Sequence, residues 1–397
     1  MSATRTAPVR PPKPAPAAGA PAPLRLLTFS TLYPSPARPH HGVFVENRLR
    51  HLLAGGEARA EVLAPVPWFP GRGRSVPACE TRHGITVHHP RFLAPPGLGM
   101  YTAPLAVLAA ARRVLRRLWA EGARFDAIDA HYLYPDGVAA IRLGREFGLP
   151  VVITARGSDT SQLPRYALPR RLIQEAMREA AALIAVSEGL KGGLVELGAP
   201  PEKVTVLRNG VDLHAFRPAV ARIPSAMPTL LTIGHLIPRK GHDLVIGALP
   251  ALPGHQLVVV GEGPERAALE GLARRLGVAD RVRFAGLQAH EDLPRFYNAA
   301  DVMILASSRE GWANVLLEAM ACGTPVIASP AWGSREAVAA PEAGMVLDET
   351  TPDTIATAVR ALLAAPPSRA ATRAYAERFG WDATTAGQIA LFRRVLA

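Results

Sequence analysis

Residues 309–327 read REGWANVLLEAMACGTPVI, a stretch that sets the local order of secondary structure. Apolar residues after Asn314 recur at helical spacing and predict a helix over 313–321. Gly323 follows the last helical position, where glycine commonly ends a helix. Apolar runs at 301–305 and 324–328 flank this helix and indicate strands. Strand, helix and strand in that order are typical of a βαβ unit in a parallel sheet.

The same alternation extends along the chain. Before residue 215, the sequence predicts strands at 24–29, 60–65, 85–89, 126–131, 150–155, 182–186 and 203–207, with helices near 43–54, 103–120, 137–147, 168–181 and 188–197. After residue 228, it predicts strands at 229–234, 256–260, 281–285, 301–305 and 324–328, with helices near 241–249, 264–276, 291–298, 313–321 and 353–364. The stretch 215–228 contains three prolines and indicates a linker. We therefore expect an α/β protein with two Rossmann-like lobes, whose parallel sheets face each other across a cleft.

Composition suggests the domain boundaries. Residues 1–23 contain seven Pro and seven Ala and no acidic residue, which predicts a disordered tail. We expect the N-terminal lobe over 24–217 and the C-terminal lobe over 218–366. Residues 367–397 are expected to be helical and to pack back toward the N-terminal lobe.

Composition also excludes several classes of protein. The 397 residues are 49% hydrophobic and 20% charged, which is typical of a globular protein. Cys79 and Cys322 are too few for a disulfide framework or a cysteine-based zinc site. The N-terminus lacks the apolar core of a signal peptide, and prolines interrupt the longest uncharged run, 244–261. We therefore expect a cytoplasmic protein.

Positive charge is concentrated in the first half of the chain. Residues 1–220 contain 28 Lys and Arg against 16 Asp and Glu, whereas residues 221–397 contain 17 of each. This asymmetry indicates an anionic partner for the first half, and a generally basic surface is the alternative. Within 105–119, a basic stripe lies beside apolar residues: Arg112, Arg113, Arg116 and Arg117 beside Leu108, Leu115 and Trp119. The pattern fits a helix on the anionic inner face of the cytoplasmic membrane, and equally an amphipathic helix packed on its sheet.

Two glutamates near a helix start make 309–327 a candidate ligand site. Asn314 and Glu318 are four residues apart and share one face of the helix, and Glu310 precedes the helix. Free N–H groups at a helix N-terminus suit a diphosphate, and carboxylates accept hydrogen bonds from ribose and sugar hydroxyls. The alternative is a pair of solvated glutamates, which are common at helix starts.

Other candidate residues follow the ends of predicted strands. Arg239 and Lys240 come after the first strand of the second lobe, either as phosphate ligands or in a solvated turn. His131 ends the strand 126–131 at the edge that faces the cleft, where a histidine is either functional or structural. Asp159 either orients a substrate or caps the next helix.

Taken together, these segments resemble a known family. Glu310 and Glu318 match the E-x7-E motif of the family 4 glycosyltransferases. The similarity extends over about residues 25–340 through the segments YPSPA and HGVFV near 33–45, HYLYPDG at 131–137, TARGSD at 154–159, RNGVD at 208–212, GHLIPRKG at 234–241 and GEG at 261–263. The chain most resembles the subgroup that acts in teichuronic-acid and exopolysaccharide assembly. It departs from the family at 332–336, WGSRE, where relatives usually carry Pro before Glu, and this leaves the donor sugar open.

The resemblance implies a GT-B fold, a nucleotide-sugar donor in the C-terminal lobe, retention of anomeric configuration and no metal or other cofactor. It places Glu318 on the ribose, and Glu310 on the hexose as a catalytic residue. The other donor-binding positions would be Gly234, Arg239, Lys240, Leu287 beside the base, Gly311, Asn314 and Val315. His131 would be catalytic near the reacting centre, and Gly42 and Asp159 would lie on the acceptor side. Either the departing phosphate takes the acceptor proton, or Glu310 acts as a covalent nucleophile.

The function implied is hexosyl transfer from a UDP- or GDP-sugar onto a growing glycan in cell-surface polysaccharide synthesis. The acceptor would be soluble or linked to polyprenyl diphosphate. The alternatives are a nucleotide-sugar 2-epimerase on the same fold and a non-catalytic membrane-binding protein. No zinc-finger, RNP or basic-zipper pattern is present in the sequence, so we expect no nucleic-acid partner.

Overall fold

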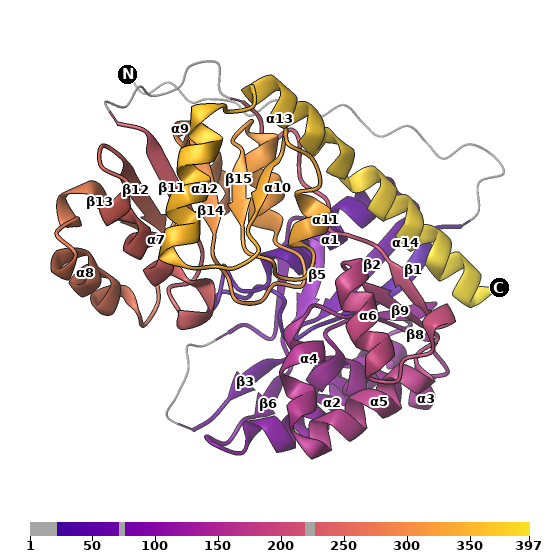
Figure 1. Ribbon diagram of the computed structural model, residues 1–397. Helices are drawn as coiled ribbons and strands as arrows, with labels where there is room; N and C mark the ends of the chain where they lie inside the picture. The colour runs from indigo at the N-terminus through magenta and orange to yellow at the C-terminus, as the bar shows by residue number, and fades with distance from the viewer. Residues whose placement is uncertain (1–21, 71–75, 219–226) are drawn as a thin grey trace, which may run out of the picture.

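A computed structural model describes residues 22–70, 76–218 and 227–397, and it divides them into two α/β lobes (Figure 1). Most of the predicted tail 1–23 and of the predicted linker 215–228 therefore lies outside the described residues. The N-terminal lobe is coloured from indigo to magenta in Figure 1, and the C-terminal lobe is mainly orange.

The larger sheet belongs to the N-terminal lobe and has eight strands among the described residues. Their order is β10 (Val204–Val206), β9 (Ala182–Ala185), β8 (Val151–Thr154), β7 (Ala127–His131), β1 (Leu24–Phe29), β2 (Ala58–Leu63), β5 (Ile85–His88) and β4 (Cys79–Arg82). The strands from β10 to β5 are parallel, as predicted, but β4 pairs antiparallel with β5. A two-residue turn causes this difference: His83 and Gly84 have φ of 48° and 76°, which turns the chain straight back.

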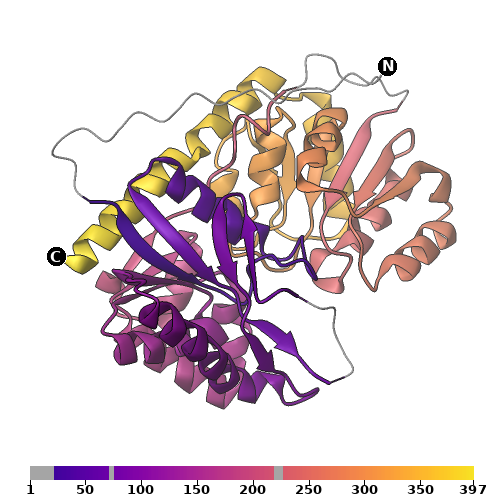
Figure 2. The same ribbon diagram turned by 180° about the vertical axis from the view of Figure 1, so that it is seen from behind.

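Helices cover both faces of this sheet (Figure 2). One face packs against four helices: α2 (Gly99–Ala120), α3 (Val138–Phe147), α5 (Ala167–Glu179) and α6 (Glu188–Glu196). The other face packs against α1 (Val43–Ala54) and the C-terminal helix α14 (Trp381–Leu396), through Leu49 and Phe392 among others. The central strands are buried on both sides, which accounts for their nearly continuous apolar sequences.

The C-terminal lobe has a second parallel sheet, with six strands in the described residues. Their order is β13 (Val282–Gly286), β12 (Gln256–Val260), β11 (Thr229–Ile233), β14 (Val302–Leu305), β15 (Val326–Ala328) and β16 (Gly344–Val346). The helices of this lobe are α7 (His242–Ala248), α8 (Arg266–Arg275), α9 (Leu293–Ala299), α10 (Asn314–Ala321), α11 (Ser334–Ala337), α12 (Pro352–Ala364) and α13 (Arg369–Ala376). Threonine caps the start of α12, where Thr351 accepts a hydrogen bond from the N–H of Thr354.

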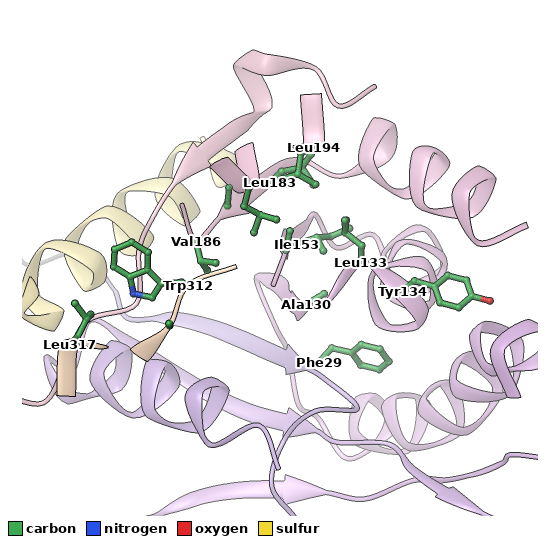
Figure 3. Close-up of a cluster of buried hydrophobic side chains, with 14 of the residues drawn as sticks. Phe29, Ala130, Leu133, Tyr134, Ile153, Leu183, Val186, Leu194, Trp312 and Leu317 are labelled. Atoms are coloured by element: carbon green, nitrogen blue, oxygen red, sulfur yellow. The ribbon is translucent and has the colours of Figure 1, made fainter. Parts of the chain in front are cut away.

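The apolar core is continuous between the lobes. Figure 3 shows N-terminal side chains such as Val186 and Leu183 in the same cluster as Trp312 and Leu317 of the C-terminal lobe. The two connections between the lobes also run side by side. Val211, in the first connection, pairs with Gly380 at the start of α14 and donates its N–H to the Phe379 carbonyl. The two lobes therefore share a packed seam beside their connections.

Most predicted elements are confirmed, with shifts at their ends. Strands 24–29 and 256–260 and helix 43–54 agree residue for residue with β1, β12 and α1. The strand predicted at 60–65 is β2 at 58–63, and helix α2 begins four residues before the predicted start at 103. Short elements were not predicted: β3 (Val66–Trp68), β4, β6 (Arg91–Leu93), β16, α4 (Ser158–Ser161) and α11. Their three or four residues are too few for a periodic pattern.

Candidate functional site

A cavity of about 550 Å³ lies between the two lobes. Its N-terminal wall comes from the loops that follow β1, β7 and β8, and its C-terminal wall from the loops that follow β11, β14 and β15. The lining residues are Leu32, Phe44, Tyr132, Arg156, Gly157, Ser158, Ser161, Gln162, Arg239, Ser308, Arg309, Glu310, Gly311, Pro330, Ala331 and Trp332. Both sheets thus direct the carboxyl ends of their strands at one space, where open α/β folds bind ligands.

Glu310 and two cations form an ion cluster on the C-terminal wall. The ammonium of Lys240 lies 2.5 Å from Glu310 Oε1, and the guanidinium of Arg239 lies 3.6 Å from the same oxygen. Backbone contacts join the two loops, because Ser308 N–H donates to the Arg239 carbonyl and Arg239 Nη1 donates to the Arg309 carbonyl. The structure therefore brings together Arg239, Lys240 and Glu310, which lie about 70 residues apart in the sequence.

Gly311 marks the closest approach of the two lobes at the cavity. A Cβ atom on Gly311 would lie 2.4 Å from the Arg156 carbonyl oxygen, and one on Gly157 would lie 3.2 Å from the Gly311 backbone. Any larger side chain at position 311 would therefore force the walls apart. Gly311 is buried between the loop that carries Glu310 and the loop that carries Arg156.

The N-terminal end of α10 faces the connection between the lobes. Asn314 opens the helix, and its Oδ1 accepts a hydrogen bond from Asn209 Nδ2 at 3.3 Å. The neighbouring Trp312 donates from its indole N–H to the Asn209 carbonyl at 3.0 Å. Val315 is half-buried and packs against the shared core.

Glu318 lies one turn further along α10 and has both carboxylate oxygens engaged. The Tyr297 hydroxyl donates to Oε2 at 2.7 Å, and His290 Nε2 lies 3.1 Å from Oε1. Burial alone would lower the pKa of His290, but the hydrogen bond and charge of Glu318 outweigh burial and raise it. Glu318 is therefore a carboxylate held by two side chains, one of which is a histidine whose pKa it raises.

Of the predicted donor positions, only Arg239, Glu310 and Gly311 line the cavity. Lys240, Asn314, Val315 and Glu318, described above, are not among its lining residues, and neither are Leu287 and Gly234. Leu287 follows β13 and is 54% exposed. Gly234 follows β11, donates its N–H to the Val260 carbonyl and lies close to Lys240. Both lie just after strands of the sheet that carries Arg239 and Glu310.

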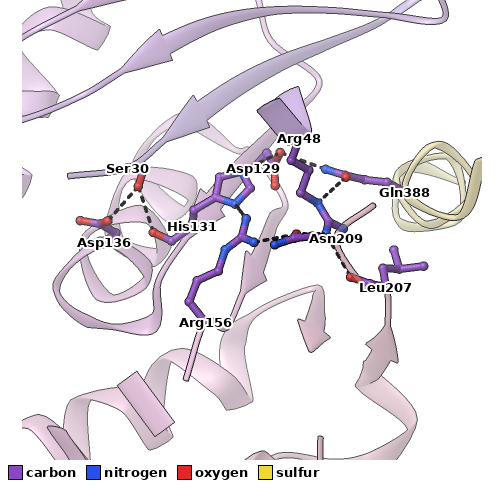
Figure 4. A network of polar contacts seen from close by, with 9 residues as sticks. All are labelled: Ser30, Arg48, Asp129, His131, Asp136, Arg156, Leu207, Asn209 and Gln388. Carbon is purple, nitrogen blue, oxygen red and sulfur yellow. Dashed lines mark hydrogen bonds and ion pairs between the residues drawn. The ribbon is translucent and has the colours of Figure 1, made fainter. Parts of the chain in front are cut away.

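His131 is buried beneath the N-terminal wall rather than lining it. Its side chain is 1% exposed, and Nδ1 lies 2.6 Å from Arg156 Nη2 (Figure 4). Nε2 lies 3.3 Å from Asp129 Oδ2. Burial lowers the pKa of His131, so the imidazole is neutral at neutral pH. Arg156, which does line the cavity, separates this histidine from the open space.

Asp159 organises the loop that carries Arg156. Its two carboxylate oxygens accept hydrogen bonds from the N–H groups of Gly157 at 2.7 Å, Leu133 at 2.9 Å and Arg156 at 3.1 Å. Burial raises the pKa of Asp159, while these backbone donors oppose the increase. Asp159 is the second residue of α4, whose cap position is Gly157 and which has no side-chain cap. The buried carboxylate therefore ties down the loop before α4 and does not cap the helix as the alternative predicted.

Gly42 begins α1 with φ of 66°, and a Cβ there would lie 1.8 Å from the Leu32 carbonyl oxygen. Only glycine fits this close approach without a shift of the backbone. The contact holds the loop of Leu32 against α1, and both Leu32 and Phe44 line the cavity.

The comparisons with known proteins agree with this geometry. Residues 41–215 match the family described as "Glycosyltransferase Family 4", and residues 216–379 match "Glycosyl transferases group 1". A D-inositol 3-phosphate glycosyltransferase of Segniliparus rotundus is 32% identical over 355 residues, which cover 81% of this chain and 78% of the relative. One of Frankia alni is 33% identical over 308 residues, covering 69% and 75%. The chain is a family 4 glycosyltransferase.

Solved structures share its two-lobed GT-B fold. A sucrose-phosphate synthase from Thermosynechococcus elongatus has a TM-score of 0.78 at 22% identity, covering 94% of this chain and 99% of that one. HepE of Anabaena in complex with UDP has a TM-score of 0.70 at 22% identity, covering 92% and 98%. The enzyme is thus a nucleotide-sugar-dependent glycosyltransferase with the predicted α/β architecture.

The loop after β15 contributes contacts between the lobes that were not predicted. Trp332 lines the cavity and lies against Gly189 and Gly193 of α6, where a Cβ on either glycine would lie within 3.3 Å of the indole. Glu336 accepts hydrogen bonds from Arg208 Nε at 3.0 Å and from Gly189 N–H at 3.2 Å. The unusual WGSRE segment therefore joins the C-terminal lobe of the enzyme to α6.

The predicted membrane-binding stripe on α2 is wrong in its apolar half. Leu108 and Leu115 are buried in the core of the N-terminal lobe, and Trp119 packs against that core. Arg112 and Arg116 pair with Glu146 of α3, each at 2.6 Å. Leu108 and Leu115 therefore have no surface that could contact a bilayer, and Trp119 is half-buried.

The part of the chain that the structure describes has no helix that is both long enough and apolar enough to cross a membrane. Within the same residues, no group of three or more His, Cys, Asp and Glu side chains is arranged to hold a metal ion.

Sequence reasoning missed several residues of the site. Arg156 lies in the TARGSD segment and was given no role, although it follows a strand end, as Arg239 and Lys240 do at a greater distance along the chain. His290 and Tyr297, which hold Glu318, lie in a helical stretch with no local pattern that points at a carboxylate. Trp332 was noted only as a departure from the family.

Proposed function

We propose that the enzyme transfers a hexosyl unit from a UDP- or GDP-sugar to a growing glycan, with retention of anomeric configuration. The observation that carries the proposal is the ion cluster on the C-terminal wall, where Arg239, Lys240 and Glu310 meet beside α10. Two cations near the start of a helix suit a diphosphate, and a carboxylate held among them suits sugar hydroxyls. Structures of HepE with UDP and with UDP-glucose support a uridine donor.

The donor would lie along the C-terminal wall. Arg239 and Lys240 bind the diphosphate together with the backbone N–H groups of Gly311, Asn314 and Val315. Glu318 binds the ribose, and Leu287 and Gly234 lie on the nucleotide side. Because His290 and Tyr297 already contact Glu318, ribose hydroxyls share this carboxylate with them.

The contacts of Glu310 favour transfer without a covalent intermediate. An ammonium at 2.5 Å and a guanidinium at 3.6 Å neutralise its carboxylate, which makes it a weak nucleophile. In the proposed step, the bond between the anomeric carbon and the diphosphate oxygen breaks as the acceptor oxygen bonds to the same face of the sugar. The acceptor proton moves to the departing phosphate, whose charge Arg239 and Lys240 stabilise. Glu310 positions the sugar hydroxyls during this step.

We propose a glycan acceptor, soluble or linked to polyprenyl diphosphate, in cell-surface polysaccharide synthesis at the inner face of the cytoplasmic membrane. The curated relatives point instead to a phosphorylated cyclitol, because they are named for D-inositol 3-phosphate. On the acceptor side, the cavity would be supported by three residues that lie beneath its lining: Gly42, Asp159 and His131.

Contact with an anionic membrane remains part of the proposal, but at another place on α2. Leu98, Tyr101 and Leu105 are 58%, 48% and 61% exposed at the start of this helix. Trp68 and Leu93, which are register partners in the β3–β6 pair beside α2, are also exposed. Exposed apolar side chains on neighbouring elements of a basic lobe suit an anionic bilayer.

Thermal unfolding in the presence of nucleotides tests the donor proposal. UDP, GDP, ADP and their common sugars would be added to the purified enzyme, with and without EDTA. A ligand at 100 times its dissociation constant adds roughly 2.7 kcal/mol of stability. We expect a shift with one nucleotide only, unchanged by EDTA, and its loss in Lys240→Ala and Glu318→Ala. Glu342→Ala, an exposed glutamate of the same lobe, is the matched control.

Stabilisation by none of the nucleotides would contradict the donor proposal. The epimerase alternative needs no acceptor, so incubation with the nucleotide sugar alone separates it from transfer. Appearance of the 2-epimer under those conditions would replace the transferase proposal.

A further inference from the structure

The N-terminal wall of the cavity carries a cation of its own. Among the described residues that line the cavity, Arg156 is the charged residue that the N-terminal lobe contributes. Arg239, Arg309 and Glu310 stand on the opposite wall, which the donor would occupy. Arg156 therefore faces the space left for the acceptor.

The Arg156 guanidinium is held in one orientation (Figure 4). Nη1 donates to Asn209 Oδ1 at 3.0 Å, Nη2 contacts His131 Nδ1 at 2.6 Å, and the group lies 5.1 Å from the centre of the Phe44 ring. These contacts use two of its five N–H groups. The N–H at Nε is buried and has no partner among the described residues. The fork is thus fixed while donors remain for a ligand.

The contact with Arg156 fixes the protonation of His131. A guanidinium has no acceptor lone pair, so His131 Nδ1 must accept the hydrogen bond and carry no proton. The proton then lies on Nε2, which faces Asp129 Oδ2 at 3.3 Å. The imidazole cannot act as a base toward a substrate in this arrangement, because Nδ1 is occupied and Nε2 is buried against Asp129. The contacts of His131 therefore indicate that it holds the Arg156 guanidinium in place.

The chain of contacts continues into the C-terminal helix. Gln388 of α14 donates from Nε2 to Asp129 Oδ2 at 3.2 Å and accepts from Arg48 Nε at 2.9 Å. Gln388 and Arg48 are each 1% exposed, so neither contact competes with solvent. A residue near the end of the chain therefore holds Asp129, which lies 3.3 Å from His131 Nε2 without a hydrogen bond to it, and His131 in turn contacts Arg156.

We propose that Arg156 binds an anionic group of the acceptor, and that Gln388 positions this arginine through Asp129 and His131. The proposal rests on the proposed transferase function and names the class of acceptor: a sugar, cyclitol or lipid carrier that bears a phosphate or a carboxylate. A planar guanidinium with free N–H groups binds both anions through paired hydrogen bonds. The hydroxyls of Tyr132 and Ser158 bond to each other on the same wall, which leaves one neutral O–H donor beside the guanidinium.

Calorimetry on the UDP-saturated enzyme tests this subsite, because UDP then fills the opposite wall. The probes are inorganic phosphate, glucuronate and neutral myo-inositol. We expect phosphate or glucuronate to bind and myo-inositol to bind much more weakly. Arg156→Gln should weaken the anion about tenfold or more and leave the UDP affinity unchanged. Arg165→Gln, an exposed arginine nine residues further on, should change neither.

Each other outcome overturns the proposal. If phosphate and glucuronate both fail to bind, or if the Arg156→Gln variant binds them as the wild type does, Arg156 is not an anion ligand. If the anion binds the enzyme without UDP and added UDP displaces it, the anion occupies the donor diphosphate site. Absence of binding by both UDP and GDP is a separate result, which contradicts the proposed function instead. If only GDP binds, the same measurements are made on the GDP-saturated enzyme.

A second variant tests the positioning chain. Gln388→Leu keeps the volume of the side chain but removes its contacts with Asp129 and Arg48. We expect anion affinity to fall about threefold or more while UDP affinity stays at the wild-type value, a split that general loss of stability would not produce. Gln174→Leu, which removes a half-buried amide elsewhere in the same lobe, is the matched control. Equal anion affinity in both variants would remove Gln388 from the proposal.

Discussion

The Asp136 carboxylate makes the stability of the enzyme depend on pH. Its Oδ2 accepts hydrogen bonds from the Thr31 N–H at 2.9 Å and the Thr31 hydroxyl at 3.1 Å, while Oδ1 is buried without a partner among the described residues. Burial raises the pKa of Asp136 to about 8, and the donors from Thr31 and Ser30 only partly oppose it. The folded state therefore keeps a proton that the unfolded chain has lost above about pH 4.

This difference gives a prediction with a definite sign. Because the folded state binds more protons between about pH 4 and pH 8, the free energy of unfolding falls as pH rises through that range. Asp136→Asn cannot titrate and keeps an oxygen for the Thr31 donors. Thermal unfolding from pH 5 to pH 9 should show a smaller loss of stability in the variant than in the wild type. Parallel curves would mean that Asp136 is ionised in the folded state.

At the scale of single residues, the sequence predicted the side chains that belong to motifs. Arg239, Lys240 and Glu310 are candidates because each follows a strand or precedes a helix, and the structure brings their charged groups together. Arg239 and Glu310 line the cavity, and Lys240 pairs with Glu310 without being one of the lining residues. Arg156 and His131 show what such reasoning lacks. The strand end placed His131 near the cleft, but only the three-dimensional packing of α1 and α14 decides that Arg156 lies in front of it.

Helix α6 packs against the C-terminal lobe at a position where a side chain would collide with Trp332. Gly192 and Gly193 are adjacent in the middle of α6, where glycine costs stability relative to alanine. A Cβ on Gly193 would lie 2.9 Å from the Trp332 ring and 3.2 Å from Thr160, whereas one on Gly192 would meet nothing within 4 Å. Only Gly193 therefore has a packing reason to lack a side chain.

The two glycines form a matched pair for measurement. Gly192→Ala should stabilise the enzyme by about 0.5–1 kcal/mol, because it improves helix propensity without a new contact. Gly193→Ala makes the same local change but displaces Trp332, so its free energy of unfolding should lie about 1 kcal/mol or more below that of Gly192→Ala. Urea denaturation of both variants measures the difference. An equal rise in the free energy of unfolding of both variants would show that Trp332 can move away from α6 without loss of stability.

Long helices and buried strands were predictable, the helices from their periodicity and the strands from apolar runs, which even four-residue strands such as β8 and β14 contain. The buried strands of both sheets and helix α1 followed from apolar patterns, and their boundaries shifted by a few residues at most. The β4–β5 hairpin was not predicted, since its turn is His83-Gly84 rather than a common hairpin pair such as Asn-Gly. The four-residue helix α11 depends on its place between the lobes, which no local pattern encodes.

The lobes of the whole molecule meet along a seam that extends from the shared core to the mouth of the cavity. Trp312 and Leu317 join the N-terminal core, and Gly311 touches the loop of Arg156. At the cavity, Gln162 with its amide oxygen turned toward Arg309 accepts hydrogen bonds from Nη1 at 3.0 Å and Nη2 at 2.5 Å. The two-lobed architecture was predictable from the repeated strand and helix pattern. This closed arrangement was not, because it depends on pairs of residues more than 100 positions apart.

Glu336 is the contact through which this closure can be tested at the scale of the molecule. Its carboxylate accepts hydrogen bonds from Arg208 and from the Gly189 N–H, and both partners belong to the N-terminal lobe. Glu336→Ala leaves a half-buried guanidinium and a backbone donor without this partner. Loss of a charged hydrogen bond costs on the order of 1.5–3 kcal/mol, which is enough to shift a two-state equilibrium about tenfold or more toward an open form.

Small-angle X-ray scattering of the ligand-free enzyme should therefore show a larger radius of gyration in Glu336→Ala than in the wild type. Arg335→Ala is the matched control, because the neighbouring Arg335 pairs with Asp348 of its own lobe in an exposed ion pair. Such pairs contribute little, so this variant should scatter as the wild type does. If Glu336→Ala also keeps the wild-type radius, the apolar seam around Trp312 holds the lobes together without the ion pair. An increase in the control would instead mean that any change in the loop after β15 opens the molecule.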